Sequence, residues 1–287
     1  MTVNQTAQRG HTYVVVDAFS DTPLQGNPVA VFFDADDLDA GRMQSIAREM
    51  NLSEVTFVLS PKQGGDAHIR VFTPVNELPF AGHPLLGTAV ALGETFPGDR
   101  LRLETAMGII DFALRRAGGK VVAAEMEQPI PVWTKFDRAN ELLAALGVAE
   151  PELPVEIYAN GPRHVFVGLP SVPALSAVNP DHRALADFPD MATNCYAGSG
   201  TSWRSRMFSP AYGVTEDAAT GSAAGPLAIH LARHGRVRFG QWIDIHQGVE
   251  MGRPSLMRAR ADGAGDRIAS VRVEGSGVTV ARGLIYV

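Results

Sequence analysis

The sequence predicts an α+β protein built from two similar halves. Most apolar segments are short, rich in β-branched residues and separated by turn residues, which is typical of antiparallel hairpins. Two segments of small apolar residues, 85–92 and 221–234, are typical of helices buried on all sides. The motifs before these segments resemble one another, which indicates an internal duplication. No glycine fingerprint follows the first predicted strand, so a dinucleotide-binding fold is disfavoured.

The first part of the chain alternates predicted strands with one amphipathic helix. The strands are expected at 12–19, 29–33, 54–59 and 67–73. In segment 38–50, apolar residues recur with helical spacing at Met43, Ile46, Ala47 and Met50. Asp36 or Asp37 is expected to cap this helix, and Asn51 to end it in the left-handed conformation.

The remaining elements follow the same alternation. After the loop 74–84 and the helix 85–92, strands are expected between 101 and 127. The second half is expected to hold a helix at 139–146, strands at 155–159, 164–169 and 203–208, a loop at 210–220, the helix 221–234 and further strands to 287. The best boundary is the Pro-rich segment 128–131. We therefore expect a disordered tail at 1–10, an N-terminal half at 11–127, a C-terminal half at 128–277, and a last strand, 278–287, that returns to the N-terminal half.

Composition excludes several classes of function. The 287 residues carry 25 Lys and Arg against 31 Asp and Glu, a net charge of −6, which argues against nucleic-acid binding. Cys195 is the one cysteine, which excludes an intramolecular disulfide and a thiolate metal cluster. No stretch approaches the roughly 18 apolar residues of a membrane span. The first ten residues are polar, so we expect a cytoplasmic protein.

Three pairs of short segments repeat in the same order along the chain. Segment 69–74 (IRVFTP) matches 205–210 (SRMFSP) at an offset of 136 residues. Segment 83–89 (HPLLGTA) matches 217–223 (DAATGSA) at an offset of 134, and 26–31 corresponds to 162–167 more weakly. By this alignment His83 and Asp217 are equivalent. An internal duplication explains the order better than chance similarity of strand–loop–helix units.

The duplication predicts a binding site for a small carboxylic acid. Each half presents a loop that ends at a helix N-terminus, where unpaired N–H groups and a partial positive charge favour an anion. Gly82 and Gly221 allow close approach of the backbone. Thr88 and Ser222 are expected to add hydroxyl donors. Two such termini across a cleft would form an anion pocket.

Several motifs resemble the PhzF family of phenazine biosynthesis. They are 26–33 (GNPVAVFF), 48–54 (REMNLSE), 72–84 (FTPVNELPFAGHP), 158–169 (YANGPRHVFVGL), 204–212 (RSRMFSPAY) and 216–222 (EDAATGS). The resemblance covers nearly all of the chain after the N-terminal tail. It implies a diaminopimelate-epimerase-like fold of two pseudo-symmetric domains, each a curled sheet around a central helix.

The resemblance also implies an activity and its residues. It implies isomerisation of trans-2,3-dihydro-3-hydroxyanthranilate to an aminoketone, without a cofactor, by a homodimer. The family's catalytic residues correspond to Glu54, His83 and Asp217. Its substrate-binding glycine and serine correspond to Gly82 and Ser222.

The residues themselves favour a proton shift by a single base. Epimerisation needs an acid/base group on each face of the inverted carbon, whereas a shift along one face needs only one. Glu54 opens an apolar strand, where desolvation should raise its pKa. The corresponding region of the second half offers only Asp187 and Asp190, in a different context. Cys195 is single, so a two-thiol mechanism is impossible.

The other candidate residues keep two interpretations each. His83 is either a structural residue near a helix start or a proton donor and polariser. Asp217 is either a capping carboxylate or an acceptor for the substrate's amino group and partner of His83. Asn27 is a candidate substrate contact because an amide both donates and accepts. His230 and His234 have zinc-pair spacing but no evident third ligand. That pair is interpreted as a solvated or packing face, and no metal is expected.

Three functions remain open at this point. The leading one is the proton-shifting isomerase. The second is a relative of the same fold that isomerises or epimerises another small amino or hydroxy acid. The third is a non-catalytic protein that binds a metabolite.

Overall fold

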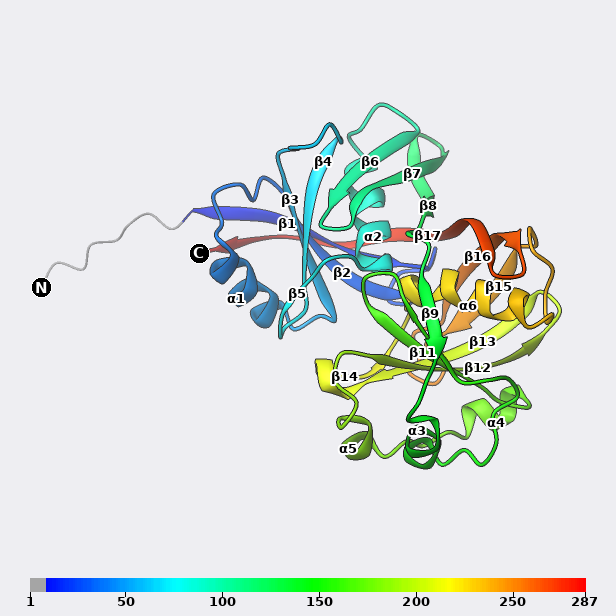
Figure 1. The fold of residues 1–287 in the computed structure, drawn as a ribbon. Coiled ribbons are helices and arrows are strands. Elements are labelled where there is room, and N and C mark those ends of the chain that lie inside the picture. The colour runs from blue at the N-terminus through cyan, green and yellow to red at the C-terminus, as the bar shows by residue number, and fades with distance from the viewer. Residues whose placement is uncertain (1–8) are drawn as a thin grey trace, which may run out of the picture.

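The computed structural model describes residues 9–287, and Figure 1 shows two sets of strands, one around helix α2 and one around helix α6. The expected disordered tail, 1–10, lies outside the described residues as far as residue 8. Gly10 already belongs to the first strand, β1, which pairs with the last strand of the chain. Among residues 9–287, no helix combines the length and apolar character that crossing a bilayer requires.

The elements alternate much as the sequence predicts. The first part contains β1 (Gly10–Ala18), β2 (Asn27–Phe32), α1 (Ala40–Met50), β3 (Glu54–Leu59), β4 (Ala67–Phe72), β5 (Glu77–Leu78), α2 (Gly82–Gly93), β6 (Arg100–Thr105), β7 (Gly108–Ala117) and β8 (Lys120–Glu127). The second part contains β9 (Val132–Lys135), α3 (Ala139–Leu146), β10 (Glu156–Ala159), β11 (Arg163–Gly168), α4 (Val172–Ser176), α5 (His182–Leu185), β12 (Ala192–Ser199), β13 (Ser202–Ser209), the 3-10 helix Pro210–Tyr212, β14 (Val214–Asp217), α6 (Gly221–Arg233), β15 (Ile243–Gln247), β16 (Ser255–Ala264) and β17 (Arg267–Tyr286).

Strand pairing repeats between the two parts. β2 runs parallel to β3, and β11 runs parallel to β12. β4 lies between antiparallel β3 and parallel β6, as β13 lies between antiparallel β12 and parallel β15. Each set then continues through antiparallel hairpins, β6–β7–β8 and β15–β16–β17. The predicted pseudo-symmetric α+β fold is confirmed.

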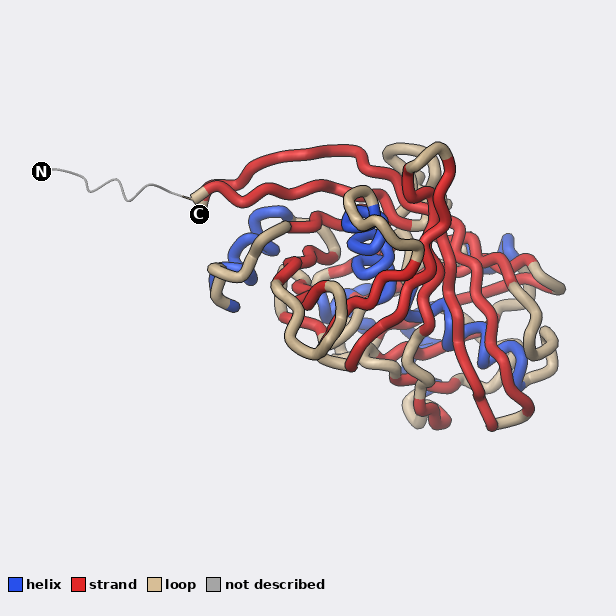
Figure 2. The backbone as a smooth tube through the Cα atoms, turned by 90° about the horizontal axis from the view of Figure 1, so that it is seen from above, coloured by secondary structure: helices blue, strands red, loops and turns tan. Residues whose placement is uncertain are grey.

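Two strand connections cross between the halves. The first part of β17 pairs with β16 and β8, whereas its residues 277–286 pair with β1. β9 follows β8 in the chain but pairs with β10. In Figure 2 the two long strands that lead toward the chain ends run side by side. The division into domains at residue 128 falls between β8 and β9 and stays a prediction.

Helix α1 begins later than its sequence signals suggested. Asp39 is the N-cap, and its side chain accepts a hydrogen bond from the backbone N–H of Arg42 at 2.8 Å. The predicted caps Asp36 and Asp37 are wrong, because Asp36 accepts from Ser60 and Asp37 pairs with Arg9. The predicted left-handed end is confirmed, since Asn51 has φ of 50°.

The two central helices each contain a proline that their position tolerates. α2 begins at Gly82 instead of residue 85, because Pro84 lies in its first turn, where a missing N–H leaves no helical bond unmade. Pro226 lies inside α6 and leaves the carbonyl of Ser222 without its helical donor. The Asn160 side chain supplies that donor at 3.0 Å. A loop of the second half thereby anchors the first turn of α6.

A partly buried ion-pair cluster joins α6 to β10. One oxygen of Glu156 accepts from Arg233 at 2.7 Å, from His230 at 3.1 Å and from His234 at 3.2 Å. His230 is fully buried, so the interpretation of these histidines as a solvated face is wrong for His230 and packing is right. Glu156 is the third residue with a possible metal-ligand atom, which the sequence did not reveal. One carboxylate oxygen of Glu156 and one nitrogen of each histidine lie within 4.8 Å of one another. Arg233 supplies the positive charge there.

We expect Glu156→Gln to destabilise the protein by about 2–3 kcal/mol, because the donors lose a charged acceptor. Burial opposes ionisation, but hydrogen bonds from His230, His234 and Arg233 hold the pKa of Glu156 below its ordinary value. The stabilisation is therefore present above the ordinary carboxyl range and is lost at lower pH. Urea unfolding at pH 7 and pH 4 measures both. Glu141→Gln, in the exposed pair with Arg138, should leave the midpoint unchanged; equal effects of the two changes would contradict the prediction.

Candidate active site

A pocket lies where α2 and α6 begin. Its lining contains six of the seven predicted site residues, namely Glu54, Gly82, His83, Asp217, Gly221 and Ser222. The other lining residues are Thr73, Leu78, Ala81, Pro162, Arg163, His164, Ala192, Met207, Ser209, Tyr212, Val214 and Thr220. The seventh predicted residue, Asn27, lies behind this wall. The pocket therefore draws residues from both halves of the chain.

The first residues of the two helices are in backbone contact. A Cβ atom at Gly82 would lie closer than 3.0 Å to the backbone of Gly221 and Ser222. A Cβ atom at Gly221 would lie 2.9 Å from the backbone nitrogen of His83. Neither N-cap residue, Ala81 or Thr220, caps its helix with a side chain. The first turns of both helices line one pocket, and no N-cap side chain occupies their N–H groups, which favours an anion there.

Glu54 is the first residue of β3, and its carboxyl group lies beside His83. Its Oε2 is 3.4 Å from His83 Nε2, and the two side chains are 17% and 3% exposed. Neither of these two atoms has a hydrogen-bond partner within residues 9–287. Burial, with a smaller contribution from the charge of Asp217, raises the pKa of Glu54 to about 8. The carboxyl group can therefore both take and give a proton near neutral pH.

His83 stays neutral in this environment. Burial lowers the pKa of His83 to about 3, and the carbonyl of Pro28 only partly opposes this. A neutral imidazole has one donor and one acceptor nitrogen. His83 can thus exchange a hydrogen bond with Glu54 without adding a charge.

Asp217 ends strand β14 and is held by three neighbours. Asn27 Nδ2 donates to its Oδ1 at 2.7 Å, and Thr220 Oγ1 donates to its Oδ2 at 2.7 Å. Gln247 Nε2 donates to the Asp217 carbonyl and to Thr220 Oγ1, both at 2.9 Å. Burial raises the pKa of Asp217 to about 6, although the bonds from Thr220 and Asn27 lower it.

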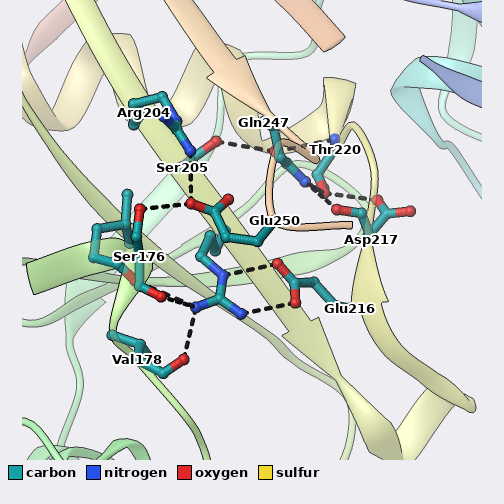
Figure 3. A network of polar contacts seen from close by, with 11 residues as sticks. Ser176, Val178, Arg204, Ser205, Glu216, Asp217, Thr220, Gln247 and Glu250 are labelled. Atoms are coloured by element: carbon teal, nitrogen blue, oxygen red, sulfur yellow. Dashed lines mark hydrogen bonds and ion pairs between the residues drawn. The ribbon is translucent and has the colours of Figure 1, made fainter. Parts of the chain in front are cut away.

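Figure 3 shows how the segment from Glu216 to Thr220 is connected to the rest of the second half. Gln247 Oε1 accepts from Ser205 at 3.0 Å, so both ends of the Gln247 amide are used. Glu216 accepts from Arg206 at 2.8 Å, and Arg206 also donates to the carbonyl of Val178 at 2.6 Å. The carboxylate of Glu216 is therefore paired with a protein group. Because Asp217 is the next residue in the chain, this ion pair also restricts the position of its backbone.

The Asn27 side chain does not line the pocket but connects two residues that do, His83 and Asp217. Besides its bond to Asp217, Asn27 Nδ2 donates to the carbonyl of Ala219 at 2.9 Å and lies 3.2 Å from His83 Nδ1. Ser53 donates to its Oδ1 at 3.3 Å. The Asn27 amide is buried and used by protein groups, and the substrate contact by Asn27 stays a prediction.

Ser222, in the first turn of α6, faces the pocket and is accompanied by a residue that the sequence did not single out. Its Oγ lies 3.1 Å from Nε2 of His164, a buried residue near the start of β11 that also lines the pocket. His164 lies within the motif 158–169, which indicates the family but not this contact.

The structure corrects two consequences of the sequence alignment. α2 and α6 begin 139 residues apart, so Gly82 corresponds to Gly221, and His83 to Ser222 instead of Asp217. Thr88 lies inside α2, fully buried, where it donates to the carbonyl of Pro84 at 2.7 Å. It is no pocket donor. Segments 83–89 and 217–223 are short and rich in small residues, so they could be aligned at an offset of 134 residues although the helices begin 139 residues apart.

The duplication makes the asymmetry of the pocket visible. Glu54 opens β3, and Ala192 opens the corresponding strand β12. Both residues line the pocket. The position that would carry a second carboxylate in a symmetric site thus carries a methyl group.

Comparisons with known proteins agree with the resemblance. The profile of the family described as phenazine biosynthesis-like protein (PhzC-PhzF) matches residues 16–283. The trans-2,3-dihydro-3-hydroxyanthranilate isomerase of Pseudomonas aeruginosa is 69% identical over 276 residues, which cover 96% of this chain and 99% of the relative. The structure of a predicted epimerase from the same organism is 30% identical, with a TM-score of 0.82 and coverage of 96% and 99%.

A more distant structure shows how widely the fold is used. A hydroxyproline epimerase from Agrobacterium vitis, solved with trans-4-hydroxy-L-proline, has a TM-score of 0.68 at 13% identity. The match covers 98% of this chain and 94% of the epimerase. At this identity the likeness extends to the fold alone, and it agrees with the predicted epimerase-like architecture.

We expect Glu54→Gln to stabilise the protein increasingly as the pH rises from about 4.5 to about 8. In this window the carboxyl group ionises in the unfolded chain, where its pKa is 4.5, but stays protonated in the fold, where its pKa is about 8. The fold binds the extra proton, so wild-type stability falls with pH, by at most about 1.4 kcal/mol per pH unit from this group. Urea unfolding of both proteins at pH 5, 6.5 and 8 measures the difference. A difference that does not grow with pH would show that Glu54 ionises normally.

Proposed function

The chain belongs to the phenazine biosynthesis-like protein family, and from this premise we propose that it isomerises trans-2,3-dihydro-3-hydroxyanthranilate to an aminoketone. The identity of 69% over nearly the full length supports this substrate. One observation supports the mechanism above all. A single buried carboxyl group with a pKa of about 8, that of Glu54, lies beside two helix starts suited to a carboxylate.

The reaction needs only the movement of protons. The dihydro ring keeps two conjugated double bonds, which link the carbon that carries the hydroxyl group to the carbon that carries the carboxylate. Removal of the proton from the first carbon lets the electron pair move through both double bonds, and a proton is added at the second carbon. The resulting enol becomes the ketone by a further proton transfer. No atom or electron is gained or lost, so no cofactor is required.

We assign the proton transfers to Glu54. As a carboxylate it takes the proton from the hydroxyl-bearing carbon, and as an acid it returns a proton to the other end of the conjugated system. The N–H groups at the starts of α2 and α6, with Ser222, bind the substrate carboxylate. Negative charge spreads into this carboxylate during the reaction, so the same donors stabilise the transition state. His83 serves as proton donor or polariser, and Asp217 accepts from the substrate's amino group.

Two further proposals concern the setting of the enzyme. We propose a homodimer, as the family resemblance implies, and a cytoplasmic location, as the sequence predicts. The active site described above is built from one chain.

We expect Glu54→Gln to lower kcat by about 10²–10⁴-fold while the protein still binds 3-hydroxyanthranilate, because the amide cannot transfer the proton. The substrate's conversion is followed by its changing absorbance, and binding of this aromatic analogue by calorimetry. Glu77→Gln, at an exposed residue paired with Arg70, is the matched control and should keep full activity. Turnover that survives in Glu54→Gln would refute the assignment, and a wild type that binds but never converts substrate would indicate a binding protein.

We expect substrate deuterated at the hydroxyl-bearing carbon to give product that keeps part of the label on the ring. A single base carries the abstracted deuteron to its new position in the pocket. Epimerisation by two bases would place solvent hydrogen at the inverted carbon, which is the outcome for the alternative of another small amino or hydroxy acid. Mass spectrometry of the product formed in ordinary water measures the retained fraction. Complete loss of label at the earliest time points would contradict the single-base mechanism.

A further inference from the structure

His164 and Asn194 form a small polar unit behind Ser222. His164 Nε2 lies 3.1 Å from Ser222 Oγ, and Asn194 Nδ2 lies 3.4 Å from His164 Nδ1. His164 is 1% exposed and Asn194 2% exposed, so neither side chain exchanges its partners for bulk water. The hydrogen-bonding direction within the unit is therefore determined by the protein.

The orientation of the Asn194 amide is set by the backbone. Its Nδ2 donates to the carbonyl of Ala192 at 3.1 Å, and an amide oxygen in that place would face another oxygen. The same NH₂ group faces His164 Nδ1, which must then be the acceptor nitrogen. A neutral imidazole with Nδ1 as acceptor carries its proton on Nε2. Burial lowers the pKa of His164 to about 3, so the ring is neutral under ordinary conditions.

This tautomer determines what the Ser222 hydroxyl can do. The Nε2–H of His164 donates to Ser222 Oγ, so the hydroxyl proton of Ser222 is left for another acceptor. Among residues 9–287, Ser222 Oγ has no hydrogen bond apart from the one with His164. The hydroxyl group lines the pocket at the start of α6. Its proton is thus available to a ligand.

We propose that His164, oriented by Asn194, is a positioning residue that makes Ser222 a hydrogen-bond donor to the substrate's carboxylate. The proposal deepens the proposed function and rests on it for the identity of the ligand. With the opposite tautomer, Ser222 would donate to His164 and present only lone pairs to the carboxylate, which repel it. His164 thus selects for an anion without contributing a charge.

The direct test is the tautomer. Long-range ¹H–¹⁵N correlation spectra of the ¹⁵N-histidine-labelled protein distinguish the two nitrogens, and the signals that vanish in His164→Gln assign the residue. We expect a protonated Nε2 and an unprotonated Nδ1 from pH 6 to 8. Protonation at Nδ1, or a charged ring in this range, would overturn the proposal whatever the protein catalyses.

Binding of 3-hydroxyanthranilate provides the second test. We expect His164→Met, which keeps the bulk but removes the donor, to raise the Kd about five- to tenfold, the loss of one hydrogen bond. His164→Gln, whose amide places an N–H near the same point, should stay within about twofold of wild type. In the Ser222→Ala background, His164→Met should cause no further loss. His11→Met, at a buried histidine outside the pocket, is the matched control and should leave the Kd unchanged.

Several outcomes would overturn the proposal. An equal loss on His164→Met in the presence and absence of the Ser222 hydroxyl would mean that His164 acts by packing alone. A failure of His164→Gln to restore binding, with its melting temperature unchanged, would mean the same. If His164→Met does not fold, the tautomer and His164→Gln still decide the matter. One outcome separates the two proposals. If the wild type binds 3-hydroxyanthranilate and the His164 variants change the Kd as expected, but the wild type never converts the substrate, the proposed function is refuted and the role of His164 is supported.

In steady-state kinetics, His164→Met should raise KM in proportion to its effect on Kd and lower kcat far less than Glu54→Gln does. This split separates a residue that positions a binding group from one that moves the proton. A fall in kcat that matches that of Glu54→Gln would assign His164 to the proton transfer and overturn the positioning role.

Discussion

The close contact between the starts of α2 and α6 is the constraint on which the rest of the site depends. Gly82 and Gly221 allow the two backbones to meet, so two sets of unpaired N–H groups, each at the positive end of a helix, share one small volume. An anion placed there is stabilised by both helices.

The fold is present twice, but the chemistry is present once. Strand order and helix placement repeat between the halves, and the helix starts are equivalent. The side chains at equivalent places have diverged: Glu54 corresponds to Ala192, and His83 corresponds to Ser222. The first half thus carries the Glu54 carboxyl group and the second half the Ser222 hydroxyl group, while each half places one helix start at the pocket. A substrate held by the proposed donors at the helix starts would present a fixed face to Glu54.

The sequence predicts the fold well because its local patterns are strong. Alternating and β-branched segments locate most strands, and the small apolar segments before Gly93 and after Gly221 locate the central helices. Glu54, His83 and Asp217 were identified through the family resemblance, because nothing local places residues so far apart in one pocket. Glu156 next to His230 was missed for the same reason. Strand pairing across the whole chain, not a local pattern, brings them together.

Other features of the site depend on side-chain orientation and protonation, which the amino-acid sequence does not specify. The direction in which the Asn27 amide points decides whether it contacts a ligand or joins His83 to Asp217. The role of His164 depends on a tautomer, which only its neighbours reveal. The residue that caps α1 depended on a difference of two or three positions among closely spaced acidic residues. In each case the residue type was compatible with several arrangements, and packing selected one.

Strand β17 has a consequence for how the molecule is made. One edge of β1 is completed by residues 277–286, which leave the ribosome long after residues 10–18. The edge of β1 that pairs with β17 therefore stays unpaired until the second half has been synthesised. Such edges promote association between chains. Cells that produce this protein should depend on chaperones most strongly during this interval, and late, long-range closure by β17 should limit the rate of folding.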